Sequence, residues 1–125
     1  MKVLLDAHAL LWWLADDPEL SQGARNAIGD PTNDVLVSAS TIWELAIKRE
    51  LGKLEAPEGL PAAIREAGFV EVPITGVDAE AAATLTAHHR DPFDRLLIAQ
   101  AARLDALVVT RDAAFRRYDA RLLLA

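Results

Sequence analysis

The sequence predicts an α/β fold built around a mostly parallel sheet, and three observations lead to this class. Short apolar runs alternate with longer segments of helical periodicity, which is typical of parallel sheets with helices between the strands. The apolar runs are continuous stretches of leucine and valine, as expected for strands covered on both faces. The chain has 125 residues, of which 52% are hydrophobic and 26% charged, and this fits one globular domain over residues 1–125.

The apolar runs define the expected strands, and the segments between them define the expected helices. Strands are predicted at 2–5 (KVLL), 34–38 (DVLVS), 69–74 (FVEVPI), 106–110 (ALVVT) and, as a short last strand, 121–124 (RLLL). Helices are predicted near 8–15, 21–29, 41–51, 58–67, 77–89 and 93–104. Turn residues form loops in DPTND (30–34) and APEG (56–59). Asp91 and Pro92 precede the last helix, where they suit the N-cap and the first helical position.

Composition and charge narrow the possible classes of function. The chain has no cysteine, which excludes disulfides and thiolate metal sites and fits a reducing cytoplasm. The N-terminal apolar run is short and contains Asp6 and His8, so it predicts neither a signal peptide nor a membrane span. The net charge of −6 argues against binding nucleic acid by charge alone. A nucleic-acid ligand would need a local basic patch, or metal ions between protein acids and phosphates.

Acidic residues follow several of the predicted strands. Asp6 follows the first strand, Glu44 comes shortly after the second, and Asp112 follows Thr110 at the end of the fourth. Asp94 opens the helix that precedes this fourth strand. Ligands of open parallel sheets bind outside the carboxyl ends of the strands. We therefore expect these four acids at one edge of the sheet.

Each of these acids also has a simpler interpretation as a helix cap. Glu44 lies three residues after Thr41, the spacing of a capping box. Asp6, Asp94 and Asp112 precede or open helices. Capping does not explain why all these helix starts share one end of the sheet, where carboxylates with no cationic partner evident in the sequence would repel one another. A divalent cation removes the conflict, and carboxylate oxygens suit Mg²⁺ or Mn²⁺ rather than zinc.

Four motifs, spread over essentially the whole chain, resemble those of a known family. They are LLDAHALLWWL, SASTIWELAIK, DPFDRLLIAQA and VVTRDAAF. The pattern is similar to that of PIN-domain ribonucleases of the VapC toxin type. The resemblance implies a three-layer α/β/α sandwich and cleavage of RNA phosphodiester bonds with one or two Mg²⁺ or Mn²⁺ ions. It also implies a homodimer whose toxicity is silenced by a small antitoxin protein.

The motifs assign roles to individual residues. By resemblance, the catalytic and metal-binding acids are Asp6, Glu44, Asp94 and Asp112. Thr110 is expected as an accessory hydroxyl, and Asp91 as the cap that orients Asp94. Separately, basic residues near the motifs either guide the RNA backbone or form an ordinary solvated face; they are Lys48, Arg49, Lys53, Arg90, Arg95 and Arg111.

The first predicted helix, HALLWWLA (8–15), has no polar face after His8. A helix that is apolar all round is buried on several sides, and a large exposed apolar patch usually marks an interface. We therefore expect Leu11, Trp12 and Trp13 to contact an amphipathic antitoxin segment. The alternative is that neighbouring segments of the same chain cover this helix completely.

Some residues have a structural explanation that we prefer to a functional one. His88 and His89 end a predicted helix, where the helix dipole favours a cationic imidazole, so we interpret them as capping residues rather than bases. The tryptophans, including Trp43, are expected in the core or an interface rather than stacked on nucleobases.

Two other classes of function stay open. One is another Mg²⁺-dependent phosphohydrolase, or a phospho-receiver domain, on a similar sheet. Such proteins usually carry a lysine after a later strand, and no lysine lies beyond Lys53. The other is a non-catalytic RNA- or protein-binding PIN module, which would not need four intact acids.

Overall fold

A parallel sheet forms the centre of the computed structural model, which describes residues 1–85, 91–118 and 120–125. The strands of this part of the chain are β1 (Lys2–Leu5), β2 (Asp34–Ser38), β3 (Val70–Val72), β4 (Leu107–Thr110) and β5 (Leu122–Leu124). They lie in the order β3-β2-β1-β4-β5, and every pairing is parallel. The predicted α/β class with a mostly parallel sheet is confirmed. The third strand is shorter than predicted, since Pro73 has no amide hydrogen to extend the ladder.

Helices connect the strands near the predicted positions. They are α1 (Ala7–Leu14), α2 (Gln22–Gly29), α3 (Ala39–Glu50), α4 (Leu60–Glu66), α5 (Gly76–Thr84) and α6 (Pro92–Leu104), followed by the 3₁₀ helix η1 (Ala113–Arg117). The helix predicted over 77–89 ends at Thr84, and its last predicted residues, 86–89, lie outside the described part of the chain. Among the described residues, no helix has both the length and the apolarity needed to cross a membrane.

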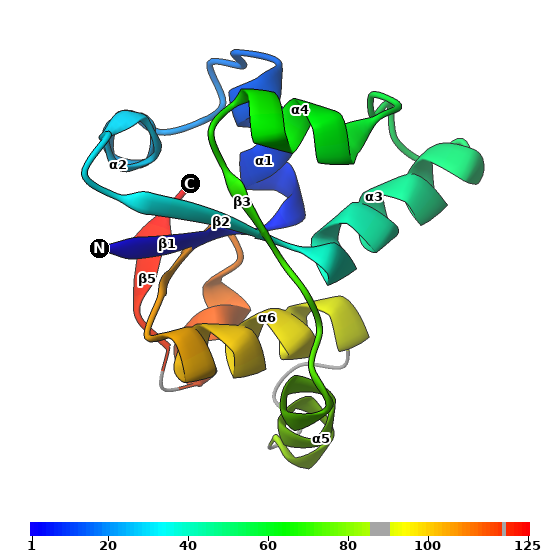
Figure 1. Ribbon diagram of the computed structural model, residues 1–125, viewed down its shortest axis with the longest axis vertical. Helices are drawn as coiled ribbons and strands as arrows, with labels where there is room; N and C mark the ends of the chain where they lie inside the picture. The colour runs from blue at the N-terminus through cyan, green and yellow to red at the C-terminus, as the bar shows by residue number, and fades with distance from the viewer. Residues whose placement is uncertain (86–90, 119) are drawn as a thin grey trace.

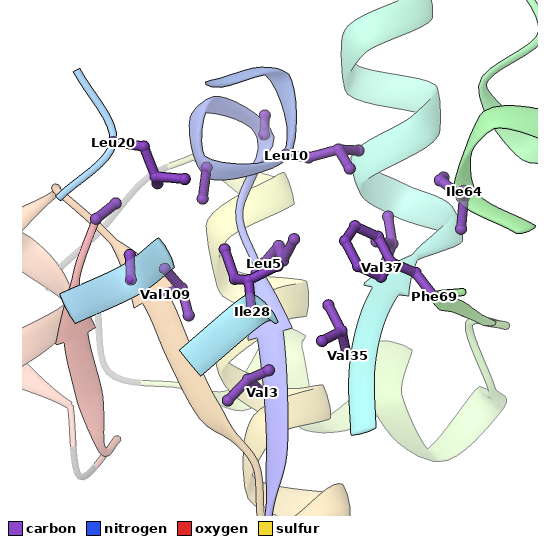
Figure 2. Packing of buried hydrophobic residues seen from close by; sticks show 14 of the residues in the cluster. Val3, Leu5, Leu10, Leu20, Ile28, Val35, Val37, Ile64, Phe69 and Val109 are labelled. Carbon is purple, nitrogen blue, oxygen red and sulfur yellow. The ribbon is translucent and has the colours of Figure 1, made fainter. Parts of the chain in front are cut away.

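The sheet separates two hydrophobic cores, which gives the three-layer arrangement implied by the resemblance. Alternating strand residues face opposite sides. Val3 and Leu5 pack with Leu10 of α1 and Ile64 of α4 (Figure 2), whereas Leu4 packs on the opposite face with Leu97 and other α6 residues. Figure 1 shows α1, α2 and α4 on one side of the sheet and α6 on the other, with α5 outside α6.

A buried ion pair joins α5 to α6, and it was not predicted from the sequence. Asp78 is 1% exposed, and its carboxylate accepts hydrogen bonds from Arg103 Nε at 2.5 Å and Nη2 at 3.0 Å. The Thr75 amide and Gln100 Nε2 donate to the same carboxylate. The Arg103 guanidinium is the main reason that the pKa of Asp78 falls from 3.8 to about 2. Asp78 is therefore a charged structural link between α5 and α6.

Candidate active site at the carboxyl edge of the sheet

Two neighbouring strands deliver Asp6 and Thr110 to the same edge of the sheet. Strands β1 and β4 are adjacent, and Asp6 follows β1 directly while Thr110 ends β4. The Asp6 amide donates to the Val109 carbonyl at 3.1 Å, which continues the ladder to the site. The strand order changes direction between β1 and β4, and such switch points are the usual binding crevices of open α/β sheets.

Asp6 combines a structural role with a perturbed carboxyl group. Its side chain caps α1 by accepting from the Ala9 amide at 2.8 Å, so the capping interpretation is correct for this residue. Burial raises the pKa of Asp6 above 3.8, and the nearby Glu44 charge raises it further. Hydrogen bonds from the Thr110 hydroxyl and the Ala9 amide oppose this rise. The carboxylate thus lies in a poorly hydrated position close to a second acid.

The Thr110 hydroxyl connects Asp6 to Asp112. It is 2% exposed and accepts a hydrogen bond from the Asp112 amide at 3.1 Å, which leaves its own proton for the Asp6 carboxylate. Asp112 itself is exposed and caps η1 by accepting from the Ala114 amide at 2.9 Å. Thr110 therefore orients Asp6, while the described contacts of Asp112 are those of a helix cap.

Glu44 reaches the same region from α3, and capping does not explain its position. Ser38, not Thr41, is the N-cap of α3, because its hydroxyl accepts from the Ser40 amide. The alternative of a Thr41–Glu44 capping box is therefore wrong. Glu44 is only 6% exposed, although a carboxylate inside a helix would normally face solvent.

Lys48 is the cationic partner of Glu44, which corrects the expectation that no such partner is evident. Its ammonium lies 2.7 Å from Glu44 Oε2, one helical turn further along α3. This hydrogen bond is the main reason that the pKa of Lys48 is raised, and the charges of Asp91 and Asp94 add to the effect. The charges of acids on both α3 and α6 therefore act on one ammonium group. The four-residue spacing of Glu44 and Lys48 is a signal that the sequence does contain.

The N-terminus of α6 has the arrangement expected from the sequence. Asp91 is the N-cap and Pro92 the first helical residue. The Asp91 carboxylate accepts from the Phe93 amide at 2.8 Å and from the Asp94 amide at 3.3 Å. Asp94 lies in the first turn and is partly buried. The cap thus fixes the backbone from which Asp94 projects.

Replacing Asp91 by alanine is expected to lower the free energy of unfolding by about 0.5–2 kcal/mol, the usual range for losing an N-cap. Two first-turn amides lose their acceptor, and Asp94 is then held less firmly. The RNA cleavage that the resemblance implies should fall only in part. Asp94→Asn serves as the comparison, because it should abolish cleavage with little change in stability. Chemical denaturation with a cleavage assay on both variants measures this, and the reverse pattern would show that the two assigned roles are exchanged.

The donor set around these acids fits a hard divalent cation. Carboxylate and hydroxyl oxygens are the ligands that Mg²⁺ and Mn²⁺ prefer. Within residues 1–85, 91–118 and 120–125, no three acidic or histidine side chains are close enough to form a finished metal site. The donors are thus of the right type, but binding an ion would require the carboxylates to come closer and Lys48 to release part of its pairing.

The other predicted RNA-contacting residues have varied surroundings. Arg49 donates to the Pro57 carbonyl at 3.1 Å and approaches Glu50 at 3.3 Å. Arg95 donates to the carbonyls of Ala82 and Leu85 in and after α5. Lys53 is exposed in the loop after α3. Arg90, His88 and His89 lie outside the described residues.

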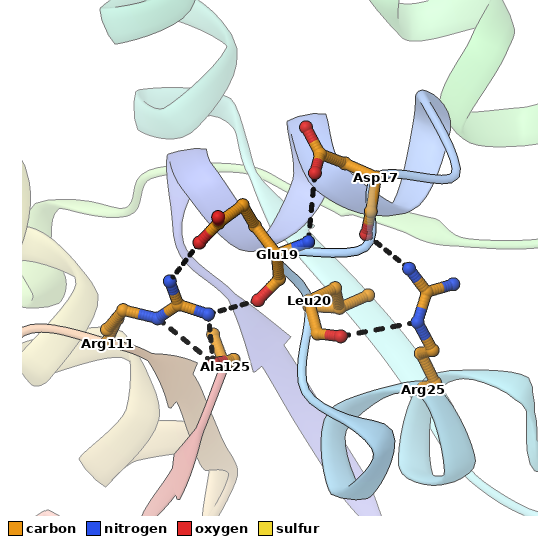
Figure 3. Close-up of polar contacts among 6 residues, drawn as sticks. All are labelled: Asp17, Glu19, Leu20, Arg25, Arg111 and Ala125. Atoms are coloured by element: carbon orange, nitrogen blue, oxygen red, sulfur yellow. Dashed lines mark hydrogen bonds and ion pairs between the residues drawn. The ribbon is translucent and has the colours of Figure 1, made fainter.

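Arg111 joins the C-terminal segment to the loop after α1. It approaches the Glu19 carboxylate at 2.8 Å and donates to the main-chain oxygens of Glu19 and Ala125 (Figure 3). Its guanidinium carbon also lies 4.4 Å from the ring centroid of Trp12. In the described structure these contacts direct Arg111 toward α1.

The apolar face of α1 is only partly covered by the rest of the chain. Leu11, Trp12 and Trp13 are each half-buried against the adjacent core. Leu11 and Trp12 line a groove of about 500 Å³ between α1 and the loop after α3. Trp13 points elsewhere, with its ring 6.1 Å from Phe69. Complete burial of this helix within one chain, the alternative considered from the sequence, is therefore wrong.

One buried polar atom near the acids was not singled out as functional. Thr41 is 1% exposed, and its hydroxyl oxygen makes no hydrogen bond within the described part of the chain. It lies three residues before Glu44, on the same side of α3. The only sequence signal was the Thr-x-x-Glu spacing, which pointed to capping.

Comparison with known proteins identifies similar chains over almost the whole length. The PIN domain family matches residues 3–121. Ribonuclease VapC22 of Mycobacterium tuberculosis (strain ATCC 25618 / H37Rv) is 32% identical over 123 residues, which covers 93% of this chain and 91% of that protein.

Solved structures with low sequence identity share the fold. A chain of VapBC2 from Rickettsia felis, solved bound to a DNA fragment from its promoter, has a TM-score of 0.71 and 15% identity, with 98% of each chain covered. A chain of FitAcB from Neisseria gonorrhoeae has a TM-score of 0.63 and 19% identity, and covers 98% of this chain and 96% of that one. At these identities the structural match concerns the fold alone.

Proposed function

The chain belongs to the PIN domain family, and from this premise we propose that it is a metal-dependent endoribonuclease, the toxin of a toxin–antitoxin pair. The observation that carries the proposal is Glu44. It is a buried carboxylate without a capping role, beside Asp6, and its partner Lys48 also lies in the field of Asp91 and Asp94. Such clustering of charge costs stability, and a functional site explains why it is present. In this proposal residues 1–125 act as one PIN domain.

The proposed ligands of one or two Mg²⁺ or Mn²⁺ ions are Asp6, Glu44 and Asp94, with Asp112 as the fourth acid. When bound, such ions would supply the positive charge that activates a water molecule and stabilises the leaving oxygen of a phosphodiester. Their charge also allows an acidic protein to accept RNA, because it offsets the repulsion between carboxylates and phosphates. The raised pKa of Asp6 and the burial of Glu44 support this assignment, since a divalent ion would offset the cost of burying both carboxylates beyond what Lys48 provides to Glu44.

The chain's own residues prepare the site for RNA. Thr110 and the Ala9 amide fix the Asp6 carboxylate by hydrogen bonds. Asp91 fixes the first turn of α6 and thus the position of Asp94. The Lys48 side chain is 38% exposed, so its ammonium can contact both Glu44 and an incoming phosphate oxygen. Lysine binds phosphate as a compact point charge.

The direct test is cleavage of total RNA by the purified full chain. We expect cleavage with Mg²⁺ or Mn²⁺ and none with a chelator, and RNA end sequencing defines the cut sites. The proposal is consistent with a cytoplasmic location, where RNA is available and a chain without cysteine needs no oxidising compartment. Metal-independent cleavage, or none with either ion, would exclude the proposed activity.

For the partner, we propose that the groove beside α1 receives an amphipathic segment of an antitoxin, and that a separate surface forms a homodimer. Leu11 and Trp12 supply apolar surface, and Asp17 and Glu55 at the same groove supply negative charge. This combination suits a helix with apolar anchors and basic flanks. An antitoxin arginine would also be attracted to the neighbouring acid cluster, which would block the site for RNA.

Replacing Leu11 by glutamate is expected to weaken antitoxin binding by at least about 10-fold, because a charge would be buried against an apolar anchor. The matched control is Leu51→Glu, since Leu51 is 62% exposed and lies outside the groove. Calorimetric titration with the protein encoded next to this chain measures the affinities. Equal effects of the two substitutions would place the antitoxin elsewhere.

A further inference from the structure

An aromatic pair with one exposed ring lies immediately beside the proposed metal ligands. Trp43 is 59% exposed, although it was expected in the core or an interface. Its ring meets the Phe93 ring edge to face, with 5.4 Å between centroids and 73° between planes. The pair links α3 to the N-terminus of α6. Edge-to-face packing fixes the orientation of the Trp43 ring, while more than half of its surface stays accessible to solvent.

The sequence position of each ring ties the pair to the acids. Trp43 directly precedes Glu44, and Phe93 directly precedes Asp94. Consecutive residues of a helix project about 100° apart, so the rings lie next to the carboxylates rather than over them. Glu44 is buried where Trp43 is exposed. An RNA whose phosphate is held at the acids would therefore bring a neighbouring base to the Trp43 ring.

On this basis we propose that Trp43, supported by Phe93, is a stacking platform for an unpaired nucleobase next to the scissile phosphate. The inference rests on the proposed ribonuclease function and extends it to a residue that contacts a base in an unpaired region of RNA. Bases in such regions can leave their stack and pack on aromatic side chains, whereas paired bases cannot. Lys48, one turn beyond Glu44 on the same helix, offers a cation to a phosphate held at the acids.

The competing occupant of this surface is a second copy of the chain. The surface holds a compact combination of two rings, a cation and acids, and this favours a nucleotide, which has a base and a phosphate. A protein interface would instead be depleted of charged residues at its centre. The experiment distinguishes the two occupants by measuring RNA affinity and self-association on the same variant.

The test uses the full chain with Asp6→Asn to prevent cleavage, Mg²⁺ in the buffer, and two labelled probes. One probe is a short single-stranded oligoadenylate, and the other is an abasic strand of the same length. Trp43→Ala should weaken binding of the oligoadenylate about 10-fold, as expected for the loss of one stacked base. It should leave binding of the abasic strand within about 2-fold, because that strand has no base to stack. Trp43→Phe should restore most of the affinity.

Leu51→Ala is the control, because it removes another exposed apolar side chain from the end of the same helix. It should change neither affinity. The stacking proposal would be wrong if Trp43→Ala lowered the affinity for both probes equally or for neither. It would also be wrong if Trp43→Ala dissociated an oligomer in sedimentation. If the wild-type chain cleaves RNA and Trp43→Ala binds normally, only this inference fails. If the wild-type chain neither binds nor cleaves RNA, the proposed function fails and the platform fails with it.

Discussion

Replacing Glu44 by glutamine is expected to lower metal-dependent RNA cleavage by more than about 100-fold while the fold survives. Loss of groups that only support a metal ligand typically costs 10- to 100-fold, and Glu44 is proposed as a ligand itself. Glutamine has nearly the same shape, so packing around this buried side chain is kept. Asp6→Asn and Asp94→Asn should have the same effect. Asp112→Asn should have a smaller effect, because Asp112 is exposed and asparagine can keep the cap of η1.

Stability separates a ligand from a structural residue in these variants. Burial raises the pKa of Asp6 in the folded chain, so the folded state favours the protonated form. The loss of stability from ionising Asp6 is absent at pH values below its ordinary pKa. It is fully present at pH values above its raised pKa in the folded chain. At neutral pH without metal, Asp6→Asn should therefore leave the melting temperature unchanged or raise it. Asparagine can still accept from the Ala9 amide as an N-cap.

The matched control is Glu50→Gln, a change of the same chemistry at the exposed end of α3. It should keep full activity and stability. Cleavage rates and melting curves of the variants, with and without Mg²⁺, give the comparison. Glu44→Gln could instead strongly destabilise the chain while the molecules that still fold cleave RNA normally. That result would show that Glu44 is only a structural partner of Lys48.

Replacing Asp78 by alanine is expected to destabilise the fold by about 3 kcal/mol. Removing one member of a buried ion pair costs about 3–5 kcal/mol, and the lower end applies because the Arg103 side chain is 33% exposed and can be rehydrated. The Thr75 amide and Gln100 lose their acceptor as well. Denaturant unfolding measures the loss, and Glu80→Ala on the exposed side of α5 is the control, with little expected change.

The pH dependence of stability should change in the same variant. The folded pKa of Asp78 is depressed to about 2 from an ordinary 3.8. Its stabilising contribution is therefore present above about pH 4 and is lost as the pH falls toward 2. The stability difference between wild type and Asp78→Ala should be constant near neutrality and shrink across this window. A difference that does not change between pH 5 and pH 2 would show that the Asp78 charge is not the source of the stability.

The local sequence pattern determined the strands and the helices. It also placed several acids directly after strands, at the carboxyl edge of the sheet. Continuous runs such as KVLL and LVVT become buried parallel strands because both of their faces are covered. Asp91 and Pro92 begin α6 as predicted, since capping depends on backbone amides only a few residues away. These features depend on near neighbours in the sequence, so the sequence alone was sufficient to predict them.

Only the tertiary structure decided which side chains meet across the layers. Asp78 and Arg103 are 25 residues apart, and nothing near either residue in the sequence indicates their pairing. Trp43 belongs to an apolar segment, yet the crossing of α3 and α6 leaves its ring exposed beside Phe93. Burial and long-range electrostatics depend on how whole helices pack on the sheet. For this reason the sequence predicted candidate acids and contained the spacing that pairs Glu44 with Lys48, whereas only the packing decided the aromatic surface beside them.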